Sequence, residues 1–217
     1  MSLGFLFSNR GWKLDIDGYL KRIDGITALS LGFLNPTDSG FHIGEQKVLG
    51  LDFYLKKDFK RLQTWISYSY GDVENRFEGL NNEDYFTSNT NIKHVFTLAG
   101  AYQIGKFELA GAWKWRTGKP YTKGSLSNNT STINFNSINT ENLPNYHRLD
   151  FSSSYSFNFS PKHALKGKFE VSLRNVYNRK NHLTKEYTGN NTLNDPIEAV
   201  DKFSLRFTPN FLFRLYF

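Results

Sequence analysis

The 217-residue sequence contains no cysteine. A disulfide framework and a thiolate metal site are therefore both excluded, although the redox compartment of the protein stays open. Long apolar segments are missing as well: charged residues or asparagine interrupt every apolar run after a few residues, and the mean hydropathy is −0.52. A membrane-spanning helix needs about 20 consecutive apolar residues, so the sequence predicts none.

A secretory signal is also missing from the start of the sequence. Residues 1–7 carry no basic segment, and Asn9 and Arg10 interrupt the apolar stretch that a signal peptide requires. If the protein is exported, its export signal is missing from these residues.

Aromatic residues, by contrast, are abundant. The chain has 20 Phe, 12 Tyr and 4 Trp, which make up 17% of it, while charged residues make up 22%. A disordered tail is poor in large apolar residues, so this composition predicts an ordered chain. The net charge of +7 permits a nucleic-acid partner. The basic residues are spread along the chain without a clustered patch, however, and we therefore expect no nucleic-acid binding.

Apolar and polar residues alternate strictly over much of the chain. In the last segment, Phe211 and Phe213 alternate with polar neighbours such as Arg214. Successive side chains of a β-strand point to opposite faces, so each such segment predicts a strand with one apolar and one polar face. The pattern predicts a partial strand at 3–7, followed by strands at 12–21, 49–55, 62–70, 96–104, 107–116, 149–157, 165–173 and 203–217. In the strand at 62–70, Trp65 is out of phase with its apolar neighbours.

The connections between these strands alternate between short and long. The short ones are expected at 9–11, 59–60, 105–106 and 160–163, and the long polar ones at 24–44, 71–91, 116–145 and 177–201. Outer-membrane barrels have this layout, with short periplasmic turns and long extracellular loops. The fold class predicted is therefore an all-β, antiparallel transmembrane β-barrel. The third long connection is rich in asparagine, and we interpret it as a solvated loop.

Catalytic, metal and cofactor motifs are not found. The segment TGKP at 117–120 has the wrong glycine spacing for a phosphate-binding loop. Asp15 and Asp17 lie inside an alternating strand and lack the later ligands of a calcium loop. The five histidines share no metal-ligand spacing, and no strand-turn-helix elbow surrounds Ser152. We therefore predict no catalytic, metal or cofactor site, and a protein that is not an enzyme.

Seven segments distributed along the chain resemble the C-terminal barrel of TonB-dependent outer-membrane receptors, the nutrient importers of Gram-negative bacteria. Their order and their places on the expected strands carry the resemblance. They are GYLKRIDGI (18–26), VLGLDFYL (48–55), WISYSYGD (65–72), TGKPYT (117–122), LPNYHRLDFSSSYSF (143–157), SLRNVYNRKN (172–181) and FLFRLYF (211–217).

The resemblance implies a part of a larger protein. Barrels of that family have about 22 strands around an N-terminal plug that carries the TonB-contacting segment. Neither the plug nor that segment has a match here, so residues 1–217 are expected to be the C-terminal part of such a barrel, with the plug absent. The implied function is import of a scarce solute, namely a siderophore, vitamin, oligosaccharide or peptide. The implied partners are outer-membrane lipid, TonB through the plug, and the barrel assembly machinery.

Three groups of residues are expected to carry that function. Candidate ligand contacts in the long loops are Arg76, Tyr85, Phe86, Tyr121, Phe135 and Tyr187. Residues expected to face the lumen and the plug are Lys114, Arg116, Arg148, Asp150 and Arg174. The resemblance further implies that Phe213, Leu215 and Phe217 form the terminal signal recognised by the assembly machinery.

Two alternatives remain open from the sequence. A self-contained small outer-membrane barrel would have a structural or adhesive role, and an upstream continuation of the reading frame would exclude it. A soluble lipocalin-like binder would instead bury the apolar faces in a core. Trp113 and Trp115 argue against the second alternative, because they are typical of lipid-facing bands with aromatic girdles.

Overall fold

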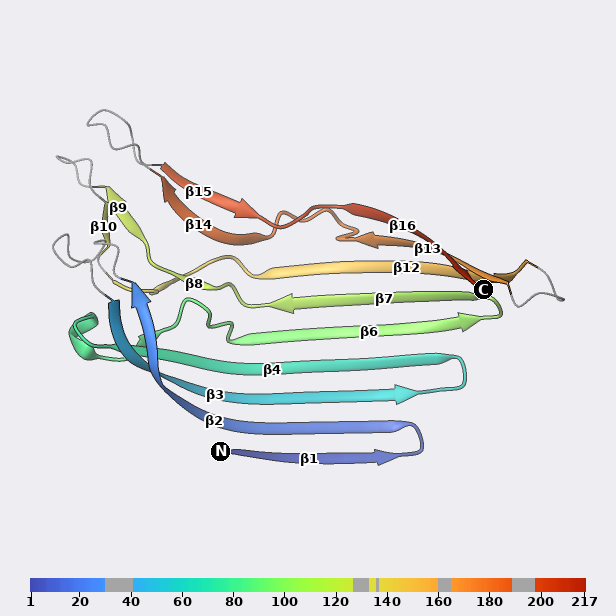
Figure 1. The fold of residues 1–217 in the computed structure, drawn as a ribbon, viewed down its shortest axis with the longest axis horizontal. Helices are drawn as coiled ribbons and strands as arrows, with labels where there is room; N and C mark the ends of the chain where they lie inside the picture. Colours follow the sequence, from blue (N-terminus) through green and yellow to red (C-terminus); the bar gives the residue numbers. More distant parts are fainter. Residues whose placement is uncertain (30–40, 127–132, 136, 160–164, 189–197) are drawn as a thin grey trace.

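The computed structural model describes residues 1–29, 41–126, 133–135, 137–159, 165–188 and 198–217. Nine long strands form one antiparallel meander, in which each strand pairs with the next one along this path (Figure 1). They are β1 (Ser2–Asn9), β2 (Trp12–Leu29), β3 (Phe41–Asp58), β4 (Leu62–Phe77), β6 (His94–Ile104), β7 (Phe107–Arg116), β12 (Tyr146–Asn158), β13 (Lys166–Arg174) and β16 (Thr208–Tyr216). The predicted partial strand and a strand for each of the eight predicted segments are present, and some of their bounds differ.

Several shorter elements lie at one end of this sheet. They are the 3₁₀ turn η1 (Asn81–Glu83), β5 (Phe86–Thr87) on β4, the pair β8 (Pro120–Tyr121) and β11 (Glu141–Asn142), the pair β9 (Gly124–Leu126) and β10 (Ile133–Phe135), and the pair β14 (His182–Thr188) and β15 (Glu198–Phe203). The strand ends from which the long connections leave lie at this end, which we call the loop end, and the short turns at 9–11, 59–60 and 105–106 lie at the other (Figure 1). This sorting of the connections is as predicted.

The first short turn shows why so few residues suffice. Arg10 and Gly11 both have positive φ, 45° and 80°. Two such residues in succession match the right-handed twist of the paired strands, which favours a two-residue hairpin. A Cβ on Gly11 would lie 2.7 Å from the carbonyl oxygen of Asp58. The turn expected at 160–163 lies outside the described residues.

The bounds of β2, β3 and β4 differ from the prediction. Residues 24–29, 41–44 and 71–77 were expected in loops, but they extend the hairpins β2–β3 and β3–β4. Polar residues such as Asp72, Glu74 and Asn75 and the glycines at 25, 44 and 71 shorten the apolar alternation here to a few residues, so the pattern does not mark these segments as strand. The ladder bulges between Asp24 and Ile26, where Gly25 has a φ of 77°.

The last predicted strand is divided. β15 ends at Phe203, residues 204–207 are not strand, and β16 begins at Thr208. In the interruption the backbone amide of Ser204 donates to the carbonyl of Asn181, and that of Phe207 donates to the side chain of Asn178. Bonds to the segment after β13 therefore replace the ladder, and the expected loop at 177–201 contains the β14–β15 hairpin.

The strand register separates an apolar from a polar face. One continuous cross-strand row consists of Leu14, Leu55, Ile66, Leu98, Trp113 and Leu149. The neighbouring row on the opposite face consists of Asp15, Tyr54, Ser67, Thr97, Lys114 and Arg148. Trp65 is out of phase because it lies on the polar face, between Lys56 and Ala99.

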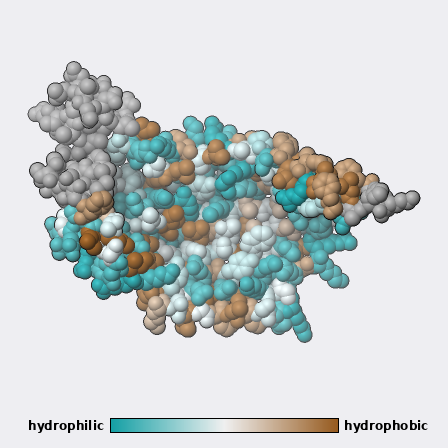
Figure 2. Space-filling view, in the orientation of Figure 1, coloured by the Kyte–Doolittle hydropathy of each residue, from teal (hydrophilic) through white to brown (hydrophobic). Residues whose placement is uncertain are grey.

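The apolar face is exposed, as expected of a surface that lipid covers. Leu98 is 46% exposed and Phe211 66% exposed, and in the described part of the chain only five apolar side chains are buried. Hydrophobic residues also gather at the short-turn end beside β13 and β16 (Figure 2). A soluble lipocalin-like binder encloses an apolar interior, and the described residues of this sheet form none.

Candidate functional site

The charged residues expected to face the lumen share the polar face. Lys114 pairs with Arg148 across β7 and β12, and the guanidinium of Arg148 lies 2.8 Å from the carboxylate of Asp150. Arg148 also donates to the hydroxyl of Tyr146 at 3.2 Å, and the guanidinium of Arg116 lies 4.7 Å from the centre of the Tyr146 ring. Side-chain contacts thus position three of these charges, those of Arg116, Arg148 and Asp150.

A groove of about 550 Å³ runs along this face. Small residues form its floor, including Ala99, Ala110, Ala112 and Ser152. Trp65 lines it from β4, while Arg174 and Glu170 line it from β13. The groove therefore offers small side chains between an aromatic ring and a set of charges.

An ion-pair cluster occupies the extended ends of β2, β3 and β4, beyond the apolar band. Its centre is Glu45, whose side chain is 9% exposed. Arg22 pairs with this carboxylate, Arg76 lies 2.6 Å from it, and the hydroxyl of Tyr85 donates to it. The ammonium of Lys47 sits 3.5 Å from the centre of the Tyr85 ring. The hydrogen bond from Tyr85, together with the two arginines, lowers the pKa of Glu45.

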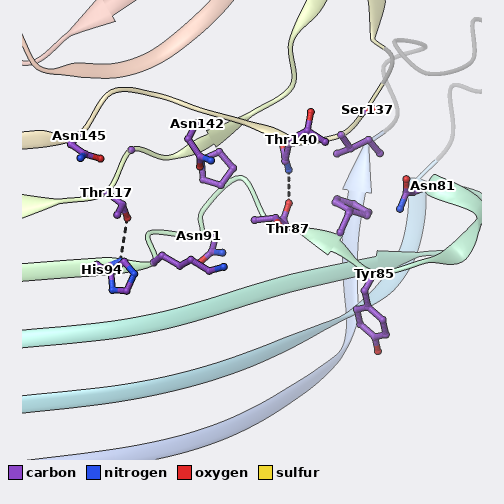
Figure 3. Close-up of a pocket in the computed structure, with 16 residues that line it drawn as sticks. Asn81, Tyr85, Thr87, Asn91, His94, Thr117, Ser137, Thr140, Asn142 and Asn145 are labelled. Atoms are coloured by element: carbon purple, nitrogen blue, oxygen red, sulfur yellow. Dashed lines mark hydrogen bonds between the residues drawn. The ribbon is translucent and has the colours of Figure 1, made fainter.

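A polar pocket opens at the loop end, between the β5 segment and the β8–β11 pair, with a volume of about 750 Å³ (Figure 3). Amide and hydroxyl side chains dominate its lining, which includes Asn81, Thr87, Asn91, Thr117, Ser137, Thr140, Asn142 and Asn145. Phe86 lines it too, whereas the Tyr85 ring points away from the other labelled residues (Figure 3).

The walls of this pocket are tied to each other. Asn139 donates to the carbonyl of Thr87 at 2.8 Å, which joins the β8–β11 side to β5. The hydroxyl of Thr122 bonds the side chain and the backbone amide of the same Asn139. The backbone amide of His94 donates to the hydroxyl of Thr117 at 3.2 Å. The lining is therefore built before any ligand arrives.

The six predicted ligand contacts do not form one group. Tyr85 and Phe86 line the pocket, although Arg76 and the Tyr85 hydroxyl are engaged by Glu45. The centre of the Tyr121 ring lies 5.5 Å from the ammonium of Lys185, and the hydroxyl of Tyr187 accepts a hydrogen bond from the amide of Gly124. Phe135 is in β10, and its side chain lies outside the described part of the structure. The ligand role of all six remains a prediction.

Asparagines after β13 form a polar clasp that the sequence reasoning missed. Asn175 and Asn181 are 0% and 1% exposed. The Asn175 side chain bonds the backbone of Arg179 in both directions and also reaches the carbonyl of Leu205. Asn181 bonds the amide and the carbonyl of His147 on β12. The spacing of three residues in N175-x-x-N178-x-x-N181, directly after a strand, is the signal that marks it.

The three residues of the expected terminal signal lie along β16 and at its end. Phe213 pairs with Phe169 and Leu215 with Gly167 on β13. Phe213 is 58% exposed and Phe217 is 98% exposed. Recognition of these residues by the assembly machinery stays a prediction.

The described residues contain neither a metal site nor a membrane-spanning helix. No group of three or more histidine, aspartate or glutamate side chains in those ranges is placed to hold a metal ion. Nor does any helix there have the length and hydropathy to cross a membrane.

Comparison with known proteins decides the family. A family model described as TonB dependent receptor-like, beta-barrel, matches residues 1–178. The chain belongs to this TonB-dependent receptor β-barrel family. No curated protein and no solved structure matches it.

Membership confirms the resemblance, the fold class and the general role in transport across the outer membrane. The matched residues include the apolar and polar faces from β1 to β13, as well as the loop-end pocket. β16 lies beyond the match but continues the same sheet by pairing with β13.

Proposed function

We propose that this chain forms part of the wall of a larger receptor barrel that imports a scarce solute with energy delivered by TonB. The observation that carries this proposal is the two-faced sheet, with a continuous lipid-facing row on one side and a grooved, charged surface on the other. Among the described residues the free edges of β1 and β16 have no strand partner. In hydrocarbon such edges must be paired, so further strands have to close the barrel.

The polar face is the surface on which a plug would rest. Arg148 and Asp150 are already paired with each other, while Arg174 and Glu170 line the open groove. A plug segment that brings both charge signs would find partners there through charge-assisted hydrogen bonds. A pull on the plug by TonB would then uncover a path along the small residues of the groove floor.

The loop end is the surface that first meets the solute. The pocket between β5 and β8–β11 opens there, and its walls are tied by hydrogen bonds. A self-contained small barrel would need β1 to pair with β16, and the described residues show no such pairing. We therefore favour the larger receptor over a structural or adhesive barrel.

The test uses the complete receptor gene in cells with and without a functional TonB. Uptake of radiolabelled ferric siderophores, cobalamin, oligosaccharides and peptides is measured, and the receptor is located by membrane fractionation. We expect the receptor in the outer-membrane fraction and TonB-dependent uptake of one solute class. Equal uptake in the two strains, or a receptor found in the soluble fraction, would refute the proposal.

A further inference from the structure

The loop-end pocket is lined almost entirely by neutral polar groups. Among its lining residues the only full charge is that of Lys93, and its ammonium already lies 3.8 Å from the carboxylate of Asp72. No arginine is among these lining residues: Arg148 and Arg174 line the groove on the polar face, and Arg179 reaches the pocket only through its bond to the carbonyl of Asn145. A ligand with net charge would find a single countercharge in this lining, a lysine that already lies beside a carboxylate, so the lining favours a neutral solute.

Several hydrogen-bonding groups of the lining are unused. Asn142 and Asn145 have exposed side chains that make no hydrogen bond within the described part of the chain. Asn91 is 3% exposed and donates to Asp72, yet its side-chain oxygen has no donor among the described residues. A buried acceptor left unpaired costs free energy, and a ligand hydroxyl in the pocket would supply the missing donor.

The chemistry of these groups indicates what the ligand must offer. An asparagine side chain presents one acceptor and two donors, and a hydroxyl group both donates and accepts. A solute with many neutral hydroxyl groups can pair with both the donors and the acceptors of these asparagines, whereas an ionised carboxylate or phosphate can only accept hydrogen bonds. The ring of Phe86 adds an apolar surface in the same pocket, on which the carbon-bound hydrogens of a sugar ring can pack.

We propose that this pocket binds a neutral oligosaccharide and so determines the substrate class of the receptor. This inference rests on the import function proposed above. The pocket volume of about 750 Å³ lies within the range of small-molecule sites and accommodates a few sugar rings. The bonds of Asn139 to Thr87 and Thr122 hold the lining in place, so little ordering is needed when the ligand binds.

Binding is tested on the complete receptor, purified in detergent and applied to an array of neutral oligosaccharides. Maltohexaose, xylohexaose and chitohexaose are then titrated by calorimetry, with hexagalacturonate as a polyhydroxylated but anionic control and ferric citrate as an anionic metal complex. We expect at least one neutral oligosaccharide to bind and both anionic probes to fail. Preference for an anionic probe would overturn the inference, and so would binding of blocked, uncharged peptides in place of every sugar.

The variant Asn142→Ala with Asn145→Ala removes two exposed amides that hold no other described residue. Two hydrogen bonds lost from the complex predict an affinity lower by about tenfold or more, with unchanged heat-modifiability of the barrel on a gel. Asn158→Ala is the matched control, because this exposed asparagine lies at the short-turn end of β12. Equal affinity of the double variant and the control would also overturn the site.

This design separates the inference from the proposed function. If no neutral oligosaccharide binds but TonB-dependent uptake of another solute is found, the pocket assignment fails and the import function stands. If an oligosaccharide binds to the wild type and not to the double variant, while uptake is equal without TonB, the site stands and the import proposal fails.

Discussion

The two ends of the same strands are stabilised by different chemistry. Toward the short turns, β3 and β4 place Leu55 beside Ile66, and these side chains face lipid. Toward the loop end, the same two strands place Glu45 beside Arg76, with Tyr85 and Arg22 around the carboxylate. The backbone ladder is continuous through both. The difference shows that the surrounding solvent, rather than strand geometry, selects the side chains of each half.

The asparagine clasp after β13 stabilises the loop end, as the apolar row stabilises the membrane-spanning half. Among the described residues Asn175 and Asn181 are the most deeply buried large side chains, and each is satisfied by hydrogen bonds to backbone groups. In the spanning half the exposed apolar residues are stabilised by lipid, while at the loop end the buried polar residues are stabilised by hydrogen bonds within the protein. Substitutions in the two regions should therefore fail in different ways.

The largest effect is expected from a charge on the apolar face. Phe211→Lys in the complete receptor places a cation where lipid surrounds the strand, at a cost of about 2 to 4 kcal/mol near the bilayer midplane. We expect a reduced amount of heat-modifiable receptor in the outer membrane. Leu212→Lys, on the polar face of the same strand, should leave that amount unchanged. Equal tolerance of both substitutions would show that the faces are assigned the wrong way round.

Loss of the clasp should be the next largest effect. Asn175→Ala removes the buried side chain that bonds the backbone of Arg179 and the carbonyl of Leu205, which costs about 1 to 3 kcal/mol. Limited proteolysis measures this loss: we expect faster cleavage at the β14–β15 hairpin, with the rest of the barrel resistant.

Asn175→Gly separates two causes of that loss, because Asn175 has a φ of 55° that glycine adopts without strain. Similar proteolysis of the alanine and glycine variants would assign the effect to hydrogen bonds. Full protection in the glycine variant would instead assign it to the backbone conformation.

The ion-pair cluster should make the loop end sensitive to acid. The pKa of Glu45 is lowered in the folded state, so its contribution to stability is complete above the usual glutamate pKa of about 4 and is lost as the pH falls through the folded value. Proteolysis of the loop end should therefore be constant between about pH 7 and pH 5 and should increase below about pH 4. Glu45→Gln should remove this increase, and an unchanged acid profile in that variant would contradict the assignment.

Deletion of Phe217 should have the smallest effect on stability, because this residue is 98% exposed. If Phe213, Leu215 and Phe217 act as the assembly signal, the deletion should nevertheless slow assembly and leave a protease-accessible precursor in pulse-chase experiments. Phe5→Ala is the control, since Phe5 is also exposed on the apolar face, but on β1. Normal assembly kinetics after the deletion would leave Phe217 a packing residue only.

Asparagine shows where reading from sequence reached its limit. The asparagine-rich segment before Tyr146 was expected to be a solvated loop, yet Asn139, Asn142 and Asn145 line the pocket. The motif after β13 entered only as part of a family resemblance, yet its asparagines are buried. Asparagine favours both turns and buried hydrogen bonds, so composition alone does not distinguish these uses.

The sequence by itself determined the strands, their two faces, the sorting of short and long connections, and the family. These features follow from a period of two and from local turn chemistry, which neighbouring residues carry. Only the tertiary structure decided the division of the last strand, the clasp and the pocket. Each depends on hydrogen bonds between distant residues, such as Asn139 with Thr87, 52 positions apart, or His147 with Asn181, 34 apart. No local pattern encodes such a pairing, because it exists only once the strand register has brought the partners together.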